Sequence, residues 1–269
     1  MISFKDVITG NRDAWNASAA LHRKSATWQH LVENVIRDDF SCLDSTLTAA
    51  LEQVGLSQKS VVQLGCNNGR EALSLFALGA TQVVGVDQSS EFLAQARELA
   101  ALSPHSPVFI EADIHNLPSD LDGRFDVALI TIGVLNWMPD MRVFFTHVAK
   151  VLKPGGVLLV YETHPFLEML NPGSVDPWRV EHSYFQTEPF IETSAIVYEG
   201  EGAEIEHPSY WHIHTLGEVL TGIAKADFRL IRFTEFPHSN REEAYAIYED
   251  PRTQVPMCFI LIAENRSGV

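Results

Sequence analysis

Two runs of the sequence decide the fold: Val61-Val62-Gln63-Leu64-Gly65-Cys66-Asn67-Asn68-Gly69-Arg70-Glu71 and, further on, Val83-Val84-Gly85-Val86-Asp87. Each run contains a short apolar stretch that is typical of a buried strand. The first run then passes through two glycines into a helical pattern, and the second ends on an acid. This order predicts a strand, a glycine loop, a helix and another strand. Glycine at the two loop positions would let the backbone approach a ligand at the start of the helix.

Asp87 closes the second predicted strand, where a Rossmann unit holds the hydroxyl groups of a ribose. The pattern therefore predicts an adenosine-containing cofactor. A dinucleotide-binding loop would carry a further glycine at the position of Asn67, because bare backbone must approach a pyrophosphate. The loop here offers side chains instead, which favours a ligand without phosphates. S-adenosylmethionine is such a ligand, and its carboxylate could use the amides at the start of the helix.

The rest of the chain alternates between strand and helix patterns, which predicts an α/β fold with a parallel sheet. Further strands are expected at residues 107–110, 125–130, 157–161, 228–236 and 255–263, and helices at residues 11–40 and 43–54 and between the strands. The pattern lapses between Pro165 and Tyr210, a stretch with five prolines. We therefore expect a helical cap over residues 1–58, a cofactor-binding core over 59–164, an inserted substrate lid over 165–214 and the end of the core over 215–269.

Composition narrows the class of protein. A chain of 269 residues with 46% hydrophobic residues can build a full core, and a net charge of −16 disfavours nucleic acid as a partner. The three cysteines, Cys42, Cys66 and Cys258, show no paired spacing, so neither a disulfide framework nor a metal site is expected. Neither a secretion signal nor an apolar run of membrane-spanning length is present. These features predict a soluble cytoplasmic protein.

An ordered set of motifs resembles the class I S-adenosylmethionine-dependent methyltransferases. After the glycine loop and Asp87 come Ala112-Asp113-Ile114, Phe125-Asp126-Val127 and Leu152-Lys153-Pro154-Gly155-Gly156, all within about residues 61–162. A closer likeness, spanning nearly the whole chain, is to a bacterial branch of small-molecule methyltransferases. It is carried by Trp15-Asn16, His22, Gln63 to Cys66, Gly133 to Asp140, Glu162 to Pro165, Tyr184-Phe185, Trp211-His212, Leu216 to Glu218 and Glu235 to Pro237.

The resemblance implies a Rossmann-like fold, with a seven-stranded, mostly parallel sheet whose last strand is antiparallel. It also implies roles in cofactor binding. Asp87 would hold the ribose, Asp113 the adenine amino group and the Ile114 amide a ring nitrogen, while Thr131 would lie near the sulfonium. The other implied cofactor-binding residues are Gln63, Gly65, Cys66, Asn67, Gly69, Gln88 and Trp15. The chain departs from the family at Gln63, usually an acid, and at Asn67, usually glycine.

Some positions keep two interpretations. Trp137 could form a wall of the pocket or belong to the core. Trp15, Asn16 and His22 could close over the cofactor or simply pack their helices.

Two histidines are candidate catalytic bases. His164 follows the predicted strand at 157–161, on the expected cofactor edge of the sheet, and histidine can accept a proton near neutral pH. His212 is the second candidate; with His214 it could also form a metal site, but no third ligand is evident. A structural role for His164 is equally compatible with the sequence, and Glu162 could orient a histidine or bind substrate.

The sequence thus predicts methyl transfer from S-adenosylmethionine to an oxygen or nitrogen of a small-molecule acceptor. Such a transfer is an in-line displacement that depends mainly on alignment and on exclusion of water. Two alternatives remain open. One is a nicotinamide-dependent oxidoreductase, which Asp87 would serve equally well. The other is a non-catalytic cofactor-binding module.

Overall fold

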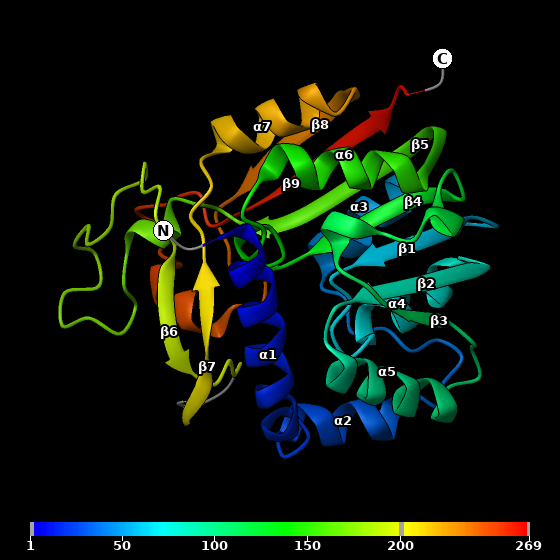
Figure 1. Cartoon of the computed structure of the whole chain (residues 1–269), viewed down its shortest axis with the longest axis horizontal. Helices are drawn as coiled ribbons and strands as arrows, with labels where there is room; N and C mark the ends of the chain where they lie inside the picture. The colour runs from blue at the N-terminus through cyan, green and yellow to red at the C-terminus, as the bar shows by residue number, and fades with distance from the viewer. Residues whose placement is uncertain (1–2, 199–201, 268–269) are drawn as a thin grey trace.

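The computed structural model describes residues 3–198 and 202–267 (Figure 1). A seven-stranded sheet runs in the order β3-β2-β1-β4-β5-β9-β8. Strand β9 is antiparallel to both of its neighbours, and the pairs among β1 to β5 are parallel. The predicted α/β fold with a mostly parallel sheet is therefore confirmed. The strands are β1 (Ser60–Leu64), β2 (Gln82–Asp87), β3 (Val108–Glu111), β4 (Phe125–Thr131), β5 (Leu152–Thr163), β8 (Phe228–Phe236) and β9 (Cys258–Asn265).

Helices cover both faces of this sheet (Figure 1). On one face lie α3 (Ser45–Val54), the short α4 (Arg70–Ser74) and α5 (Ser90–Leu102); on the other lie α6 (Met141–Val151) and α7 (Leu216–Lys225). Successive residues of a strand point to opposite faces, so Val61 packs in the first layer and Val62 in the second. Because both faces are covered, the central strands are buried along nearly their whole length.

Two further helices, α1 (Phe4–His22) and α2 (Ala26–Asn34), precede this core. Helix α1 starts earlier than the sequence pattern predicts, because Ser3 and Asp6 form a capping box. It is attached to α5 through Asn16, whose Oδ1 accepts a hydrogen bond of 2.7 Å from the Ser89 hydroxyl. Asn11 bonds both backbone groups of Tyr210 on the opposite side, at 2.7 and 3.1 Å. Helix α1 thus connects the core to the inserted segment.

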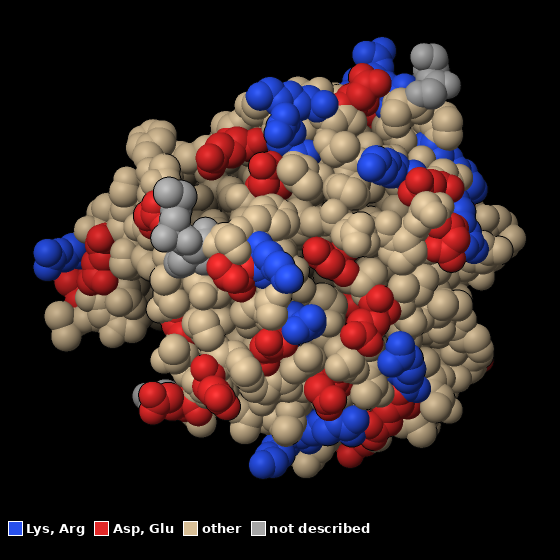
Figure 2. Space-filling view, in the orientation of Figure 1, with Lys and Arg blue, Asp and Glu red and all other residues tan. Residues whose placement is uncertain are grey.

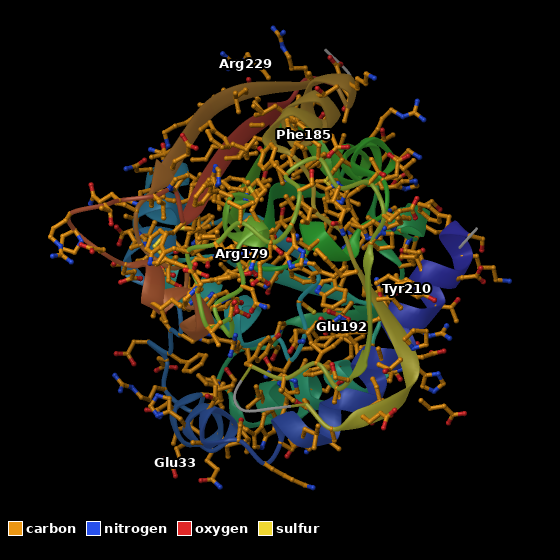
Figure 3. All side chains as sticks on the ribbon, turned by 90° about the vertical axis from the view of Figure 1, so that its left-hand side faces the viewer. Glu33, Arg179, Phe185, Glu192, Tyr210 and Arg229 are labelled. Atoms are coloured by element: carbon orange, nitrogen blue, oxygen red, sulfur yellow. The ribbon has the colours of Figure 1, made fainter. Side chains whose placement is uncertain are left out.

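The insertion contains a two-stranded antiparallel sheet, β6 (Phe190–Ser194) and β7 (Glu204–Trp211), beside α1. Figure 3 shows Glu192 and Tyr210 on these strands, with Tyr210 next to α1. The sequence pattern missed both strands, because most of their residues are exposed or half-buried and the usual apolar alternation is absent. Six 3₁₀ segments complete the described chain: η1 (Leu75–Leu78), η2 (Ile114–Asn116), η3 (Ser119–Leu121), η4 (Leu135–Trp137), η5 (Leu167–Met169) and η6 (Glu243–Tyr248).

Among the described residues, no helix is both long and apolar enough to cross a membrane. On the face drawn in Figure 2, acidic and basic side chains are interspersed, without a continuous basic surface.

Candidate active site

A cavity of about 770 Å³ opens at the carboxyl ends of the parallel strands. Strand β1 lies between β2 and β4, so the chain order reverses there, and open α/β sheets bind ligands at such a point. We use the term cavity floor for the lining residues at the carboxyl ends of strands β1 to β4 and directly after them. These are Gly65, Asn67, Asn68, Asp87, Gln88, Ala112, Asp113, Ile114, Thr131 and Ile132.

Asp87 organises the floor. Its Oδ2 accepts a hydrogen bond of 2.7 Å from the Asn67 amide, and its Oδ1 accepts one of 2.9 Å from the Ser89 amide. Burial raises the pKa of Asp87, although these backbone bonds oppose the shift. Each carboxylate oxygen has two acceptor sites, so both keep capacity for a ligand. The arrangement suits the pair of hydroxyl groups of a ribose.

The backbone conformation of the loop between β1 and α4 explains why asparagine and glycine occupy it. Asn67 has a φ of +49°, a left-handed conformation that asparagine tolerates better than most residues, and its Oδ1 accepts a bond of 2.8 Å from the Asn68 amide. Gly69 has a φ of +73°, and a Cβ there would lie 2.5 Å from the Phe109 ring. Packing against the core therefore requires glycine at position 69.

Asp113 begins the turn after β3. Its Oδ1 accepts bonds from the His115 amide at 2.9 Å and from His115 Nδ1 at 3.1 Å. Burial alone would raise the pKa of Asp113, but the bonds from His115 outweigh it and the pKa is lowered. The ionised carboxylate thus keeps Oδ2 as an acceptor beside Ile114. An adenine amino group is a donor that fits this position.

Gln63 lies beneath Thr131, and its Nε2 donates a bond of 3.1 Å to the Thr131 hydroxyl. The Oε1 of Gln63 is buried and has no hydrogen-bond partner among the described residues. Gln63 does not line the cavity, so this oxygen does not face a ligand there. The carboxylates of Asp87 and Asp113 and the glycine loop do face the cavity, and these residues fit S-adenosylmethionine.

The opposite side of the cavity, which we call the cover, comes from distant parts of the chain. Trp15 of α1 belongs to it, and its ring centroid lies 5.4 Å from that of Trp137 and 6.3 Å from that of Tyr198 of the insertion. Trp137 both lines the cavity and packs on Trp211 at 4.7 Å, so it serves as wall and as packing residue. The other cover residues include Ile8, His22, Trp28, Leu31, Val197, Arg241, Glu242 and Ala244.

Sequence reasoning missed a charged cluster at the edge of the cavity. Arg70 Nε donates a bond of 2.9 Å to Glu71 Oε1, and Arg241 Nη1 reaches the same oxygen at 3.4 Å. Burial would raise the pKa of Glu71, but the two arginines lower it overall. Arg70, Glu71, Arg241 and Glu242 all line the cavity. Because Glu71 and Arg241 are 170 residues apart in sequence, no local pattern could have indicated their contact.

The structure thus brings together most of the expected cofactor-binding residues. Trp15, Gly65, Asn67, Asp87, Gln88, Asp113, Ile114 and Thr131 line one cavity, whereas Gln63, Cys66 and Gly69 lie behind its surface. The Cys66 thiol is fully buried, and burial raises its pKa well above the usual value. Its position does not suggest direct contact with a ligand.

His164 lies outside the residues that line the cavity. Its Nδ1 accepts a bond of 3.0 Å from the Phe166 amide, and its Nε2 lies 3.0 Å from Glu235 Oε1. Burial lowers the pKa of His164, although Glu235 opposes that shift. Both ring nitrogens are engaged, so the side chain fixes the turn after β5. This geometry does not support its expected role as a base for a molecule in the cavity.

His212 also lies outside the residues that line the cavity. Its ring stacks on that of His214, with centroids 5.9 Å apart, and burial lowers the pKa of His212 to about 4. Within the described part of the chain, no three histidine, cysteine, aspartate or glutamate side chains lie close enough to hold a metal ion.

Glu162 is buried and accepts hydrogen bonds from the amides of Gly133, Thr163 and Leu135. Burial raises the pKa of Glu162 to about 7. Its carboxyl group therefore anchors the segment after β4, and none of its hydrogen bonds among the described residues involves His164 or His212.

Comparisons with known proteins agree with this geometry. Residues 62–160 match the methyltransferase domain family. Trans-aconitate 2-methyltransferase from Escherichia coli O1:K1 is 32% identical over 155 residues, which cover 57% of this chain and 53% of that protein. The chain thus matches about half the length of the curated relatives.

Two solved structures show the same fold. One is an S-adenosylmethionine-dependent methyltransferase from Mesorhizobium loti, with a TM-score of 0.54 and 21% identity over 80% of this chain and 96% of that one. The other, described as the (4+2)-cyclase SpnF, has a TM-score of 0.58 and 16% identity over 95% of this chain and 97% of that one. The same fold therefore occurs in a protein named for a different reaction.

The sheet order defines a Rossmann-like fold, which this chain shares with solved S-adenosylmethionine-dependent methyltransferases. Within that fold, residues 62–160 match the methyltransferase domain family.

Proposed function

We propose that this protein transfers the methyl group of S-adenosylmethionine to an oxygen or nitrogen of a small-molecule acceptor. The observation that carries the proposal is the cavity floor. It places Asp87, Asp113 and the glycine loop along the carboxyl ends of adjacent parallel strands, facing one cavity. The domain match and the curated relatives, which are named for a small organic acid, support the same function.

When bound, S-adenosylmethionine supplies an electrophilic methyl group on its sulfonium. The protein's part is to bind and orient: Asp87 accepts hydrogen bonds from the ribose, and Asp113 accepts one from the adenine. Trp15 and Tyr198 cover the cavity and exclude water, which favours an in-line displacement. A carboxylate oxygen has no proton to lose, and a hydroxyl or amine acceptor would release its proton to water, because neither His164 nor His212 lines the cavity.

The acceptor must fit beside the cofactor under the cover, which limits it to a small molecule. The net charge of −16 disfavours a nucleic acid. All three cysteines are free thiols, which is consistent with activity in the cytoplasm.

Titration calorimetry tests the cofactor. We expect S-adenosylhomocysteine and S-adenosylmethionine to bind at micromolar concentrations and NADH to give no heat. If neither adenosyl compound bound at millimolar concentration, the proposal would be abandoned, and tight NADH binding would favour the oxidoreductase alternative. Incubation with S-adenosylmethionine and a panel of small hydroxyl and amine compounds, followed by detection of S-adenosylhomocysteine, then separates an enzyme from a non-catalytic module.

A further inference from the structure

Arg70 is the first residue of α4 and directly follows the glycine loop. Its guanidinium is fixed in two ways. Nε donates to Glu71 Oε1 at 2.9 Å, and Cζ lies over the Tyr198 ring, 5.5 Å from its centroid, in a cation–π contact. The ion pair and the ring contact together set the orientation of the side chain in the cavity wall.

The two terminal amino groups of Arg70 make no hydrogen bond to any described residue. These nitrogens are not among the buried atoms that lack a hydrogen-bond partner, so they are accessible to solvent. The Arg70 side chain as a whole lines the cavity and is 23% exposed. The terminal nitrogens are therefore the part of the guanidinium that a ligand can reach. A planar fork of N–H donors matches a carboxylate, which can accept two parallel bonds from it.

The contacts around Glu71 indicate that Arg70 does more than form a structural ion pair with it. Glu71 is shared by Arg70 and by Arg241, which also lies 3.5 Å from Asp44 Oδ2. Glu71 thus keeps a cationic partner without Arg70, and Arg70 directs more donors into the cavity than Glu71 uses. Preorganisation of this kind lowers the cost of ordering the side chain when a ligand binds.

We propose that Arg70 binds a carboxylate inside the cavity through its two terminal amino groups. The inference rests on the proposed function. In that setting the carboxylate comes from one of two sources. It belongs either to the methionine part of the cofactor, which would lie next to the glycine loop, or to the acceptor, which would lie under Tyr198.

Binding measurements on Arg70→Gln and Arg70→Lys test the cofactor source. S-adenosylhomocysteine carries the methionine carboxylate, whereas 5′-methylthioadenosine keeps the adenosine and sulfur but lacks the amino-acid part. If the cofactor is the source, Arg70→Gln should weaken S-adenosylhomocysteine binding about 10- to 100-fold and leave 5′-methylthioadenosine binding unchanged. Arg70→Lys should give an intermediate loss, because the charge stays and the fork is lost.

Trans-aconitate tests the acceptor source, in the presence of saturating S-adenosylhomocysteine, with its trimethyl ester as the control without carboxylates. If the acceptor is the source, Arg70→Gln should leave binding of both adenosyl compounds unchanged. It should weaken trans-aconitate binding by about 10-fold or more and have no effect on the ester.

Arg37→Gln is the matched control, because Arg37 is likewise paired with a nearby acid, Asp39, but lies on the surface. Thermal unfolding checks that each variant is folded, and Arg70→Lys preserves the charge beside Glu71 if Arg70→Gln does not fold. The proposal is overturned if both adenosyl compounds weaken equally. It is also overturned if the variants bind both adenosyl compounds as tightly as wild type does and also do not differ from wild type towards trans-aconitate, whether all of them bind it or none does. Failure of the wild type itself to bind S-adenosylhomocysteine would instead overturn the proposed function, and this inference with it.

Discussion

The floor and the cover of the cavity are built in different ways. The floor consists of short segments at the carboxyl ends of β1, β2, β3 and β4 and directly after them, all within residues 65–132. The cover brings together α1, α2, residues 197–198 and residues 241–244, which are far apart in the chain. The floor is therefore fixed by the parallel sheet itself, whereas the cover depends on side-chain contacts between separate elements.

This difference assigns different tasks to the two regions. Floor residues bind through the backbone and through carboxylates that are already held by amides, as Asp87 is. Cover residues offer aromatic rings that pack on one another, as Trp15 does on Trp137 and Tyr198, whereas the charged cluster of Arg70 and Glu71 lies at the edge of the cavity. We expect changes in the floor to abolish cofactor binding or folding. Changes in the cover should alter pH dependence and selectivity.

Asp87→Asn should have the largest effect. The substitution removes the negative charge that would accept bonds from both ribose hydroxyl groups, and its amide cannot accept from both the Asn67 and the Ser89 backbone N–H. We expect S-adenosylhomocysteine to bind about 1,000-fold more weakly, roughly 4 kcal/mol, by calorimetry. Asp38→Asn, at an exposed acid, should leave the affinity unchanged. A loss of less than threefold for Asp87→Asn would show that the floor does not hold the ribose.

Gly69→Ala separates two reasons for a glycine directly behind the floor. The new Cβ would meet the Phe109 ring at 2.5 Å and would sit at a φ of +73°. Left-handed strain and overpacking together should lower the free energy of unfolding by about 3–4 kcal/mol in urea titrations. Gly123→Ala is the control for strain alone, since its φ is +64° and nothing lies within 4 Å of the Cβ. It should cost about 1–2 kcal/mol; equal losses at both sites would exclude the packing explanation.

Glu168→Gln tests a buried carboxyl group of η5 behind the cover. Trp211 Nε1 donates to Glu168 at 2.8 Å, but burial, with Glu242 nearby, raises the pKa of Glu168 from 4.5 to about 7. A raised pKa means that the folded state favours the protonated form, so this contribution to stability is present below pH 4.5 and is lost as the pH rises to 7. Over that interval, ionisation of Glu168 should lower the free energy of unfolding of the wild type by about 2–3 kcal/mol, and the variant should not show this decrease.

Urea unfolding of wild type and Glu168→Gln at pH 4.5, 6 and 8 measures this difference. Glu162, whose pKa is also about 7, is present in both proteins, so its contribution cancels in the comparison. Glu188→Gln, at an exposed position of the insertion, should follow the wild-type curve. If the curve for Glu168→Gln were parallel to that of wild type, ionisation of Glu168 would not limit stability.

Parts of the floor were predictable because local signals coincide there. Asp87 and Thr131 end apolar strands, and Asp113 lies two residues beyond the end of another, so the topology of a parallel sheet brings all three to one edge. The same reasoning placed His164 at this edge, and it lies just after β5, but its ring turns to Glu235 and the Phe166 amide instead of the cavity. Position along a strand predicts which edge a residue occupies, whereas its neighbours decide which way the side chain points.

By itself, the sequence determined the alternation of strands and helices, the order of the motifs and most of the residues that form the floor, because short-range periodicity and turn chemistry specify each of these. Only the tertiary structure decided that Arg70, Glu71, Tyr198, Arg241 and Glu242 meet at one wall of the cavity. It also decided that His164 and His212 lie outside it. Contacts between segments more than a hundred residues apart depend on how whole elements pack, and no local pattern encodes them.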